Sequence, residues 1–304
     1  MSITNDSPSS TQGWAALAAL SLAALFWSGN FIAGRALRED VDPVTLNTLR
    51  WLLACALYMP FAGPACLRHA EAIRRHWLWL LALGATGIAG FHTMVYMALT
   101  QTTATNALLV LALAPVGIVI GSALLGASWP SRVQWAGSAV SLVGATVLIT
   151  RADPEVLRRL TLNHGDLWML AAVVIWAAYT LLLKHRPDDL PPNVTLAASM
   201  VIGAALMVPV AILTVPTMHL VASPGFLGAL AYIVIFPSIL AFRFWGYGVA
   251  RLGPERAGQF VHLMPVFGPI LAMAILGERV VAVQVLGAVV IFTGIALVLR
   301  GKGA

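Results

Sequence analysis

Charged residues are scarce in this chain of 304 residues. Lys, Arg, Asp and Glu make up 10% of it, whereas apolar residues make up 60% and the mean hydropathy is +0.87. These values lie far outside the range of soluble domains. A large soluble helical protein would need polar faces along its helices, and the sequence lacks them. The composition therefore indicates an integral membrane protein.

Motifs for enzymatic chemistry are missing as well. The sequence has no GxxxxGK[ST] phosphate loop, no HExxH and no GxSxG, which excludes ATP-driven transport and leaves a membrane transferase without acids or nucleophiles. Cysteine is rare, and Cys55 and Cys66 are interpreted as inert thiols rather than a disulfide or a metal site. We therefore expect no enzyme, no catalytic residues, no metal and no cofactor.

Acidic residues are absent from the middle of every long apolar run. All twelve lie in loops or at run ends: Asp6, Glu39, Asp40, Asp42, Glu71, Asp153, Glu155, Asp166, Asp188, Asp189, Glu255 and Glu278. Carboxylates are the usual proton carriers of ion-coupled pumps. Their positions argue against proton antiport through a membrane glutamate. If the protein moves a solute across the membrane, facilitated diffusion is the simplest mechanism, and proton coupling through a histidine stays open.

The sequence does contain long apolar runs. Runs near twenty residues match a hydrocarbon core of ~30 Å crossed at ~1.5 Å per residue. We count ten, and five fall in each half: 14–36, 44–63, 77–99, 104–126, 132–150, 166–184, 193–215, 224–250, 257–276 and 281–299. The predicted fold is an all-α integral membrane protein with ten transmembrane helices.

The two halves are near copies, 150 residues apart. Val133-Gln134 and Gly137 recur as Val283-Gln284 and Gly287. Because each copy holds an odd number of spans, the second copy must enter the membrane from the opposite side, which predicts two inverted five-helix repeats. The expected division is a tail over 1–13, a first repeat over 14–150, a linker over 151–165 and a second repeat over 166–300.

Basic residues predict the orientation. With the N-terminus inside, ten loop Lys and Arg lie on the inner side and six on the outer, which favours two cytoplasmic termini. The first run is interpreted as an uncleaved anchor, because no basic residue precedes it. We expect a multi-pass protein of the bacterial inner membrane. The basic residues are scattered over short loops, so no nucleic-acid partner is expected, and a monomer is plausible.

Few polar or deep aromatic side chains lie within the runs. Rings stack on flat apolar solutes, and an Arg or His can hold a carboxylate. A sugar phosphate would need a denser basic cluster, and a lipophilic cation would need a buried acid. The pattern predicts a small, partly aromatic, neutral or zwitterionic solute in a cavity lined by Trp27, Asn30, His92, Tyr96, Trp176, Tyr179, Trp245 and His262.

Several of these residues have a second interpretation. Arg50 is placed close to the outer interface, where snorkelling or pairing with Asp42 is favoured over a site role. Arg243 either serves the pathway or snorkels inward. His92 and His262 either line the cavity or are core histidines that donate to a carbonyl. The tryptophans near run ends are assigned to the interfacial belt: Trp14, Trp51, Trp77, Trp79, Trp129 and Trp168.

Small residues and prolines shape the runs. Gly137 and Gly144, which recur as Gly287 and Gly294, are interpreted as helix-packing sites. Pro115 and Pro265 occupy the same place in both copies. Each removes a backbone hydrogen bond, so we interpret both as hinges; a tolerated kink with no moving part is the alternative.

A family resemblance rests on short motifs over residues 14–300. They are Trp27-Ser28-Gly29-Asn30-Phe31, Arg50, the Ala-rich approaches to Pro115 and Pro265, and Gly277-Glu278-Arg279 followed by Gln284-x-x-Gly287. With these motifs the chain resembles the ten-span EamA-type branch of the drug/metabolite transporter superfamily, and most of all its aromatic amino-acid exporters. One departure is Ser128, which stands where the second copy has Glu278.

The resemblance implies two inverted repeats, a central cavity and export of amino acids or other metabolites. We expect an exporter of amino acids, aromatic ones preferred, that works by alternating access with a small-molecule substrate in a lipid bilayer. The alternative is a flippase for a lipid or a lipid-linked sugar.

Overall fold

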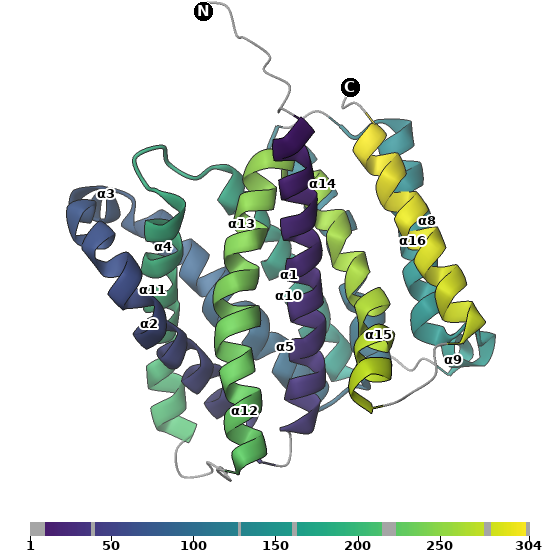
Figure 1. The fold of residues 1–304 in the computed structure, drawn as a ribbon, viewed down its shortest axis with the longest axis horizontal. Helices are drawn as coiled ribbons and strands as arrows, with labels where there is room; N and C mark the ends of the chain where they lie inside the picture. Colours follow the sequence, from purple (N-terminus) through teal and green to yellow (C-terminus); the bar gives the residue numbers. More distant parts are fainter. Residues whose placement is uncertain are drawn as a thin grey trace, which may run out of the picture.

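The computed structural model describes residues 10–37, 40–126, 129–159, 163–214, 223–276 and 281–301. Helices follow one another along the chain (Figure 1). The first half contains α1 (Ser10–Ala36), α2 (Pro43–Arg68), α3 (Ala70–Arg75), α4 (Trp77–Leu83), the π-helical η1 (Gly84–Gly90), α5 (Phe91–Leu99), α6 (Ala104–Leu111), α7 (Ala114–Leu124) and α8 (Arg132–Thr150).

The short helix α9 (Pro154–Arg158) lies in the predicted linker. The second half contains α10 (His164–Lys184), α11 (Pro192–Thr214), α12 (Pro224–Ile233), the π-helical η3 (Val234–Leu240), α13 (Ala241–Leu252), α14 (Pro254–Gly258), the 3-10 helix η4 (Gln259–Leu263), α15 (Met264–Leu276) and α16 (Ala282–Arg300). The motif residues Ser128, Glu278 and Arg279 lie outside the described residues.

Nine of the helical segments in the described ranges are long and apolar enough to cross a membrane. They coincide with nine of the ten predicted runs. The remaining run, 257–276, is helical but interrupted, because the 3-10 turn of η4 separates α14 from α15. The fold is thus the expected all-α membrane protein, and 257–276 is the one predicted run that does not coincide with one of these nine segments.

The packing of α8 against α16 shows that the repeats are inverted. A methyl group added at Gly137 would lie 2.7 Å from the carbonyl oxygen of Gly294, and one added at Gly144 would lie 2.9 Å from that of Gly287. Residue numbers rise along one helix as they fall along the other, so the two helices are antiparallel. Because they are the same element of each repeat, the repeats run in opposite directions. Figure 1 shows this pair at one edge of the bundle.

Local capping explains where several spans begin. Asp42 precedes α2 and accepts hydrogen bonds from the backbone N–H of Val44 (3.1 Å) and Thr45 (3.0 Å). Ser131 precedes α8 and forms a capping box with Gln134, and such boxes satisfy N–H groups that a helix start leaves free. The start of α1 and the end of α16 lie at one end of the bundle, and α9 lies at the other (Figure 1).

A π-helical segment occurs at the same place in each repeat. Residues 84–90 form η1 and residues 234–240 form η3, an offset of 150. The extra residue in a π-helical turn frees backbone groups and often marks a functional position. Both segments border the centre of the molecule, where the candidate site lies.

Candidate functional site

The side chain of Arg50 lies at the centre of the bundle and is fully buried. Its Nε–H donates to Ser238 Oγ at 2.6 Å, and its Nη1 donates to Tyr96 Oη at 3.3 Å and to Asn30 Oδ1 at 3.5 Å. Four helical segments therefore converge on one guanidinium: α2, η3, α5 and α1. Its Cζ also lies 5.0 Å from the centre of the Trp51 ring, within the range of a cation–π contact.

The favoured interpretation of Arg50 was wrong. The side chain does not reach the interface, and Asp42 instead caps α2 and accepts a hydrogen bond from Thr45 Oγ1 at 2.5 Å. In the part of the chain that the structure describes, Arg50 has no carboxylate within ion-pair distance and its Nη2 has no hydrogen-bond partner. A buried charge without a counter-ion costs several kcal/mol, so this group is suited to receive an anion.

A proline in η3 explains why Ser238 faces Arg50. Pro237 has no N–H to donate inside the helix. The carbonyl oxygen of Ile233 accepts a hydrogen bond from the Ser238 hydroxyl at 2.7 Å. That bond uses the only hydroxyl proton, so the oxygen is left as an acceptor for the Arg50 Nε–H. The local backbone of η3 thus sets the direction of the guanidinium.

Aromatic rings surround the same region. The ring centre of Trp176 lies 5.0 Å from that of Trp27, 5.3 Å from that of Trp245 and 5.3 Å from that of Tyr179. Phe242 packs beside them, 5.6 Å from Tyr179. The two indole N–H groups have acceptors: Trp27 Nε1 donates to the carbonyl of Pro237 at 3.1 Å, and Trp245 Nε1 to Thr180 Oγ1 at 3.3 Å. These bonds fix the rings in place.

Trp51 is a site residue that sequence reasoning placed elsewhere. It was assigned to the interfacial belt, but the structure buries it completely, with its ring 5.2 Å from that of Phe242 and 6.2 Å from that of His92. Trp14, Trp77 and Trp129, from the same list, are 72%, 55% and 60% exposed. Trp51 lies four residues after Asn47 and on one helical face with Arg50, a sequence signal that could have identified it as internal.

Unpaired polar atoms gather on this face of α2 and its neighbour α5. Among the described residues, six buried side-chain polar atoms lack a hydrogen-bond partner, and four of them belong to Asn47 (Oδ1), Arg50 (Nη2), Trp51 (Nε1) and His92 (Nδ1). Buried polar groups are normally satisfied by protein or water. The group combines donors with an acceptor, which suits a small polar ligand or ordered water.

A small cavity opens beside these residues. Its walls include Trp27, Asn30, Phe91, His92 and Trp176, and its volume is about 20 Å³. This is room for about one water molecule. An aromatic solute does not fit in this conformation, so its binding requires the surrounding helices to move apart.

The eight predicted lining residues separate into three groups. Trp27, Asn30, His92 and Trp176 line the cavity. Tyr96 contacts Arg50, and Tyr179 and Trp245 stack against Trp176 behind the wall. His262 does not join them.

His262 is held in a separate buried network. Its Nε2 lies 2.8 Å from the carbonyl oxygen of Ala112, and its Nδ1 lies 2.7 Å from Ser141 Oγ. Gln259 donates from Nε2 to Ser138 Oγ at 3.0 Å in the same network. The alternative interpretation of a core histidine that donates to a carbonyl describes this geometry, and the network joins η4 to α8.

The predicted hinge prolines lie at matching helix starts. Pro115 is in the first turn of α7, just after the break that ends α6 at Leu111. Pro265 is in the first turn of α15, just after the 3-10 turn of η4. Both therefore follow an interruption in the helix, where backbone geometry can change with few hydrogen bonds lost.

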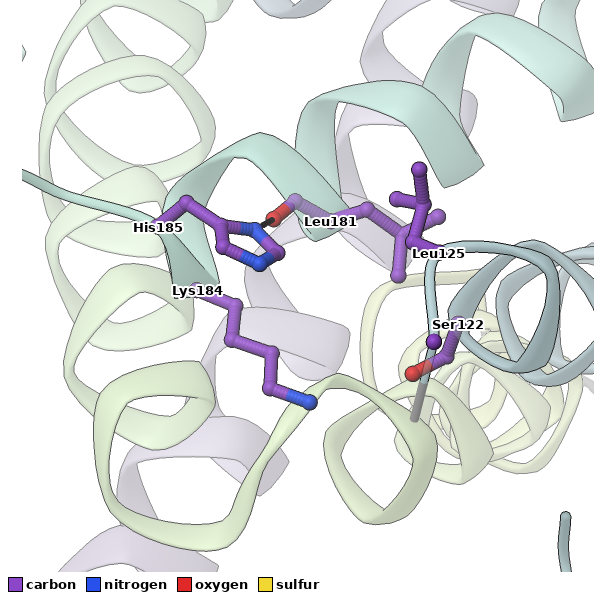
Figure 2. A pocket seen from close by; sticks show the side chains of 6 residues that line it. Ser122, Leu125, Leu181, Lys184 and His185 are labelled. Atoms are coloured by element: carbon purple, nitrogen blue, oxygen red, sulfur yellow. Dashed lines mark hydrogen bonds between the residues drawn. The ribbon is translucent and has the colours of Figure 1, made fainter. Parts of the chain in front are cut away.

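Both ends of the bundle are tied by polar contacts. At the end that holds the start of α1, Glu255 of α14 accepts a hydrogen bond from Ser122 of α7 and lies 3.7 Å from Lys184 Nζ of α10. Ser122 and Lys184 line a cavity of about 160 Å³ that also borders His185, and Figure 2 shows their side chains.

At the opposite end, Thr102 Oγ1 donates to Asp166 Oδ1 at 2.6 Å, which ties the α5–α6 turn to α10. Polar contacts between the two repeats thus lie at both ends of the bundle.

Inverted helical repeats, a buried unpaired cation and a small central cavity are the features of a multi-pass membrane transporter. Residues 14–150 and 163–300 each match the EamA-like transporter family, and the chain belongs to that family. It is 29% identical over 224 residues to the uncharacterized transporter YyaM of Bacillus subtilis (strain 168), which covers 73% of each chain.

Two further similarities cover nearly the whole chain. A probable terminal-alkyne amino-acid exporter of Streptantibioticus cattleyicolor is 26% identical over 286 residues, 93% of this chain and 92% of that one. A solved crystal structure of a protein with 24% sequence identity has the same fold, with a TM-score of 0.73 over 93% of this chain and 96% of the other.

Proposed function

We propose that this transporter exports amino acids, with aromatic ones preferred, by alternating access between its two repeats. The observation that carries the proposal is the buried guanidinium of Arg50, whose Nη2 lacks a partner at the edge of an aromatic cage. The substrate class named for the relative from Streptantibioticus cattleyicolor supports amino acids in general.

The chemistry of the site matches the two parts of such a solute. A carboxylate would pair with the free N–H of Arg50, and charge-assisted bonds of this kind are among the strongest in proteins. Its ammonium group would meet the Asn30 oxygen and the faces of the tryptophans. A flat side chain would lie among the rings of Trp27 and Trp176, which border the cavity.

Passive transport is the simplest mechanism for this arrangement. In the described spans the carboxylates lie near helix ends, and Asp166, the third residue of α10, is an example. Carboxylates are the usual proton carriers within membranes. We therefore propose facilitated diffusion down the solute gradient, with separation of the Glu255–Lys184 pair at one end and of the Thr102–Asp166 contact at the other as alternating steps.

We also propose the location and orientation. The protein resides in the bacterial inner membrane with both termini in the cytoplasm. The distribution of basic residues favours this orientation, and the start of α1 and the end of α16 share one end of the bundle (Figure 1).

Solute uptake into proteoliposomes tests the proposal. Purified protein is reconstituted, and uptake of labelled phenylalanine, tryptophan and threonine is measured with and without an imposed pH gradient. Saturable uptake without a gradient, faster for the two aromatic solutes, is the expected result. Uptake that requires the gradient would replace facilitated diffusion with proton coupling. Absence of uptake for every amino acid would contradict the substrate class and favour a flippase.

A further inference from the structure

Only two charged residues in the described spans lie more than one helical turn from a span end: Arg50, which is buried, and Arg243, which is exposed. Arg243 makes no contact with the central site. Its Nη1 donates to Tyr58 Oη at 3.0 Å, and its Cζ lies 6.0 Å from the centre of the Tyr58 ring. Tyr58 belongs to α2 and is 6% exposed, so the tyrosine anchors the arginine at the surface of the bundle.

Arg243 is the first member of a polar row along α13. Tyr247 and Arg251 follow at intervals of four residues, and all three are exposed, whereas Phe242, Trp245 and Val249 on the other side are buried. Arg251 lies with its Cζ 5.5 Å from the centre of the Tyr247 ring and donates to Gln12 at 2.6 Å. Within the described residues, neither arginine has an Asp or Glu at ion-pair distance.

Depth in the membrane explains how this row can be tolerated. The span Pro224–Leu252 has 29 residues, or about 43 Å at ~1.5 Å per residue, whereas the hydrocarbon core measures ~30 Å. The ends of the helix therefore reach into the headgroup layers. Arg243 lies nine residues before Leu252, within the hydrocarbon layer but close enough for its long side chain to extend to the boundary.

The neighbouring surface of α2 is apolar. Leu53, Leu57 and Phe61, on the helix that carries Tyr58, are 43%, 44% and 78% exposed, so this helix presents an apolar surface suited to lipid chains. Because Arg243 lies within the hydrocarbon layer, a soluble anion would have to enter that layer to reach it. A phospholipid would place its phosphate on the arginines and its own acyl chains on the leucines.

We propose that Arg243, Tyr247 and Arg251 of α13, with Tyr58 of α2, form a binding site for the phosphate headgroup of an anionic phospholipid, in the leaflet at the end of the bundle that holds the start of α1. Two cations without a counter-ion provide the charge complementarity. The site belongs to the lipid-facing surface, and it is separate from the central cavity and from the proposed substrate.

Thermal unfolding in the presence of lipid tests the site. Full-length protein in a neutral detergent is titrated with dioleoyl-phosphatidylglycerol, and the apparent dissociation constant is obtained from the rise in melting temperature. Replacing Arg243 with Gln keeps a donor for Tyr58 but removes the charge. We expect binding about fivefold weaker, the loss typical of one basic residue at a membrane surface.

Matched variants and ligands separate the explanations. Arg300→Gln removes an exposed charge at the same end of the bundle, and it should leave the dissociation constant unchanged. Tyr58→Phe should weaken lipid binding less than Arg243→Gln, because the charge remains. Equal weakening by Arg300→Gln would overturn the site in favour of a general surface charge effect. Equal stabilisation by inorganic phosphate, or by phosphatidylcholine, would overturn an anionic lipid as the ligand.

Discussion

The third span of each repeat has the same backbone but different chemistry. Each is interrupted by a π-helical segment at the same place, η1 in the first repeat and η3 in the second. His92 follows the first segment and Phe242 follows the second, at equivalent positions, and their ring centres lie 6.2 Å apart. Equivalent residues that meet in this way lie beside the axis that relates the repeats. The backbone is therefore symmetric at the point where the side chains differ.

Other equivalent positions show the same difference. Arg50 corresponds to Met200, and Ser238 corresponds to Ile88; all four are buried. A symmetric backbone allows the repeats to exchange conformations, which alternating access requires. Asymmetric side chains give the site one charged end and one aromatic end, which suits a solute with a single orientation. We therefore expect the symmetric backbone to serve the conformational change and the asymmetric side chains to recognise the solute.

Replacing Arg50 with methionine, the residue at the equivalent position of the second repeat, should have the largest effect on amino-acid uptake. In Arg50→Met the cavity loses its only cation among the described lining and contacting side chains. We expect the initial rate of amino-acid uptake to fall about 30-fold or more, the loss usual for one partner of a buried charge pair. The melting temperature should be kept or raised, because a buried guanidinium with an unpaired N–H is costly. Uptake and melting are measured on the same preparation.

An exposed arginine provides the control for this variant. Arg300→Met removes a charge at the end of α16 and should leave uptake unchanged. Uptake by Arg50→Met at the rate of the unmodified protein would contradict the role of Arg50 in binding a carboxylate.

Making the axis pair identical is expected to have the next largest effect. His92→Phe gives two phenylalanines at the equivalent positions and removes the ring nitrogens from the cavity wall. We expect the KM for phenylalanine to rise about tenfold, as for loss of one hydrogen bond to a charged group. His92→Gln keeps a donor and should restore part of the loss. An equal KM for His92→Phe and the unmodified protein would exclude a polar role for His92.

Ser238→Ala tests the positioning of Arg50 and should have a smaller effect. The Nε–H loses its acceptor at 2.6 Å, but Tyr96 and Asn30 still hold Nη1. We expect the KM to rise about fivefold, with the maximal rate unchanged. Ser199→Ala, at an equally buried serine that donates to the Leu196 carbonyl, is the matched control. A fall in the maximal rate without a change in KM would contradict a positioning role.

The fold was largely predictable because membrane insertion imposes simple rules. Apolar runs of fixed length gave nine of the observed spans, and the 150-residue offset gave the inverted repeats that the contact of Gly144 with Gly287 confirms. Pro265 indicated a break near η4, but its 3-10 form was not predicted, because hydropathy measures polarity and is insensitive to a local change of helix type.

The candidate site was only partly predictable. Residue type and helical face identified Trp27, His92 and Trp176 as neighbours of a cavity. Depth along α2 was a poor guide for Arg50 and Trp51, because burial depends on which helices cover that face. The neighbours of His262 come from α8 and from Ala112, and such contacts between distant segments leave no pattern in one sequence.

The α8–α16 pair, where the repeats remain symmetric, should respond to substitution in the opposite way to the central site. In Gly144→Ala the new methyl group would lie 2.7 Å from the backbone nitrogen of Ile291, so the helices must separate. We expect a loss of ~1–3 kcal/mol in the free energy of unfolding, as for other overpacked sites, seen as a lower melting temperature. The KM for phenylalanine should be unchanged, because neither Gly144 nor its contact Gly287 borders the cavity. Gly228→Ala, at a helical glycine with open space around it, should lose no stability. A changed KM in Gly144→Ala would show that the symmetric contact also shapes the binding site, and the separation between a symmetric scaffold and an asymmetric site would then be lost.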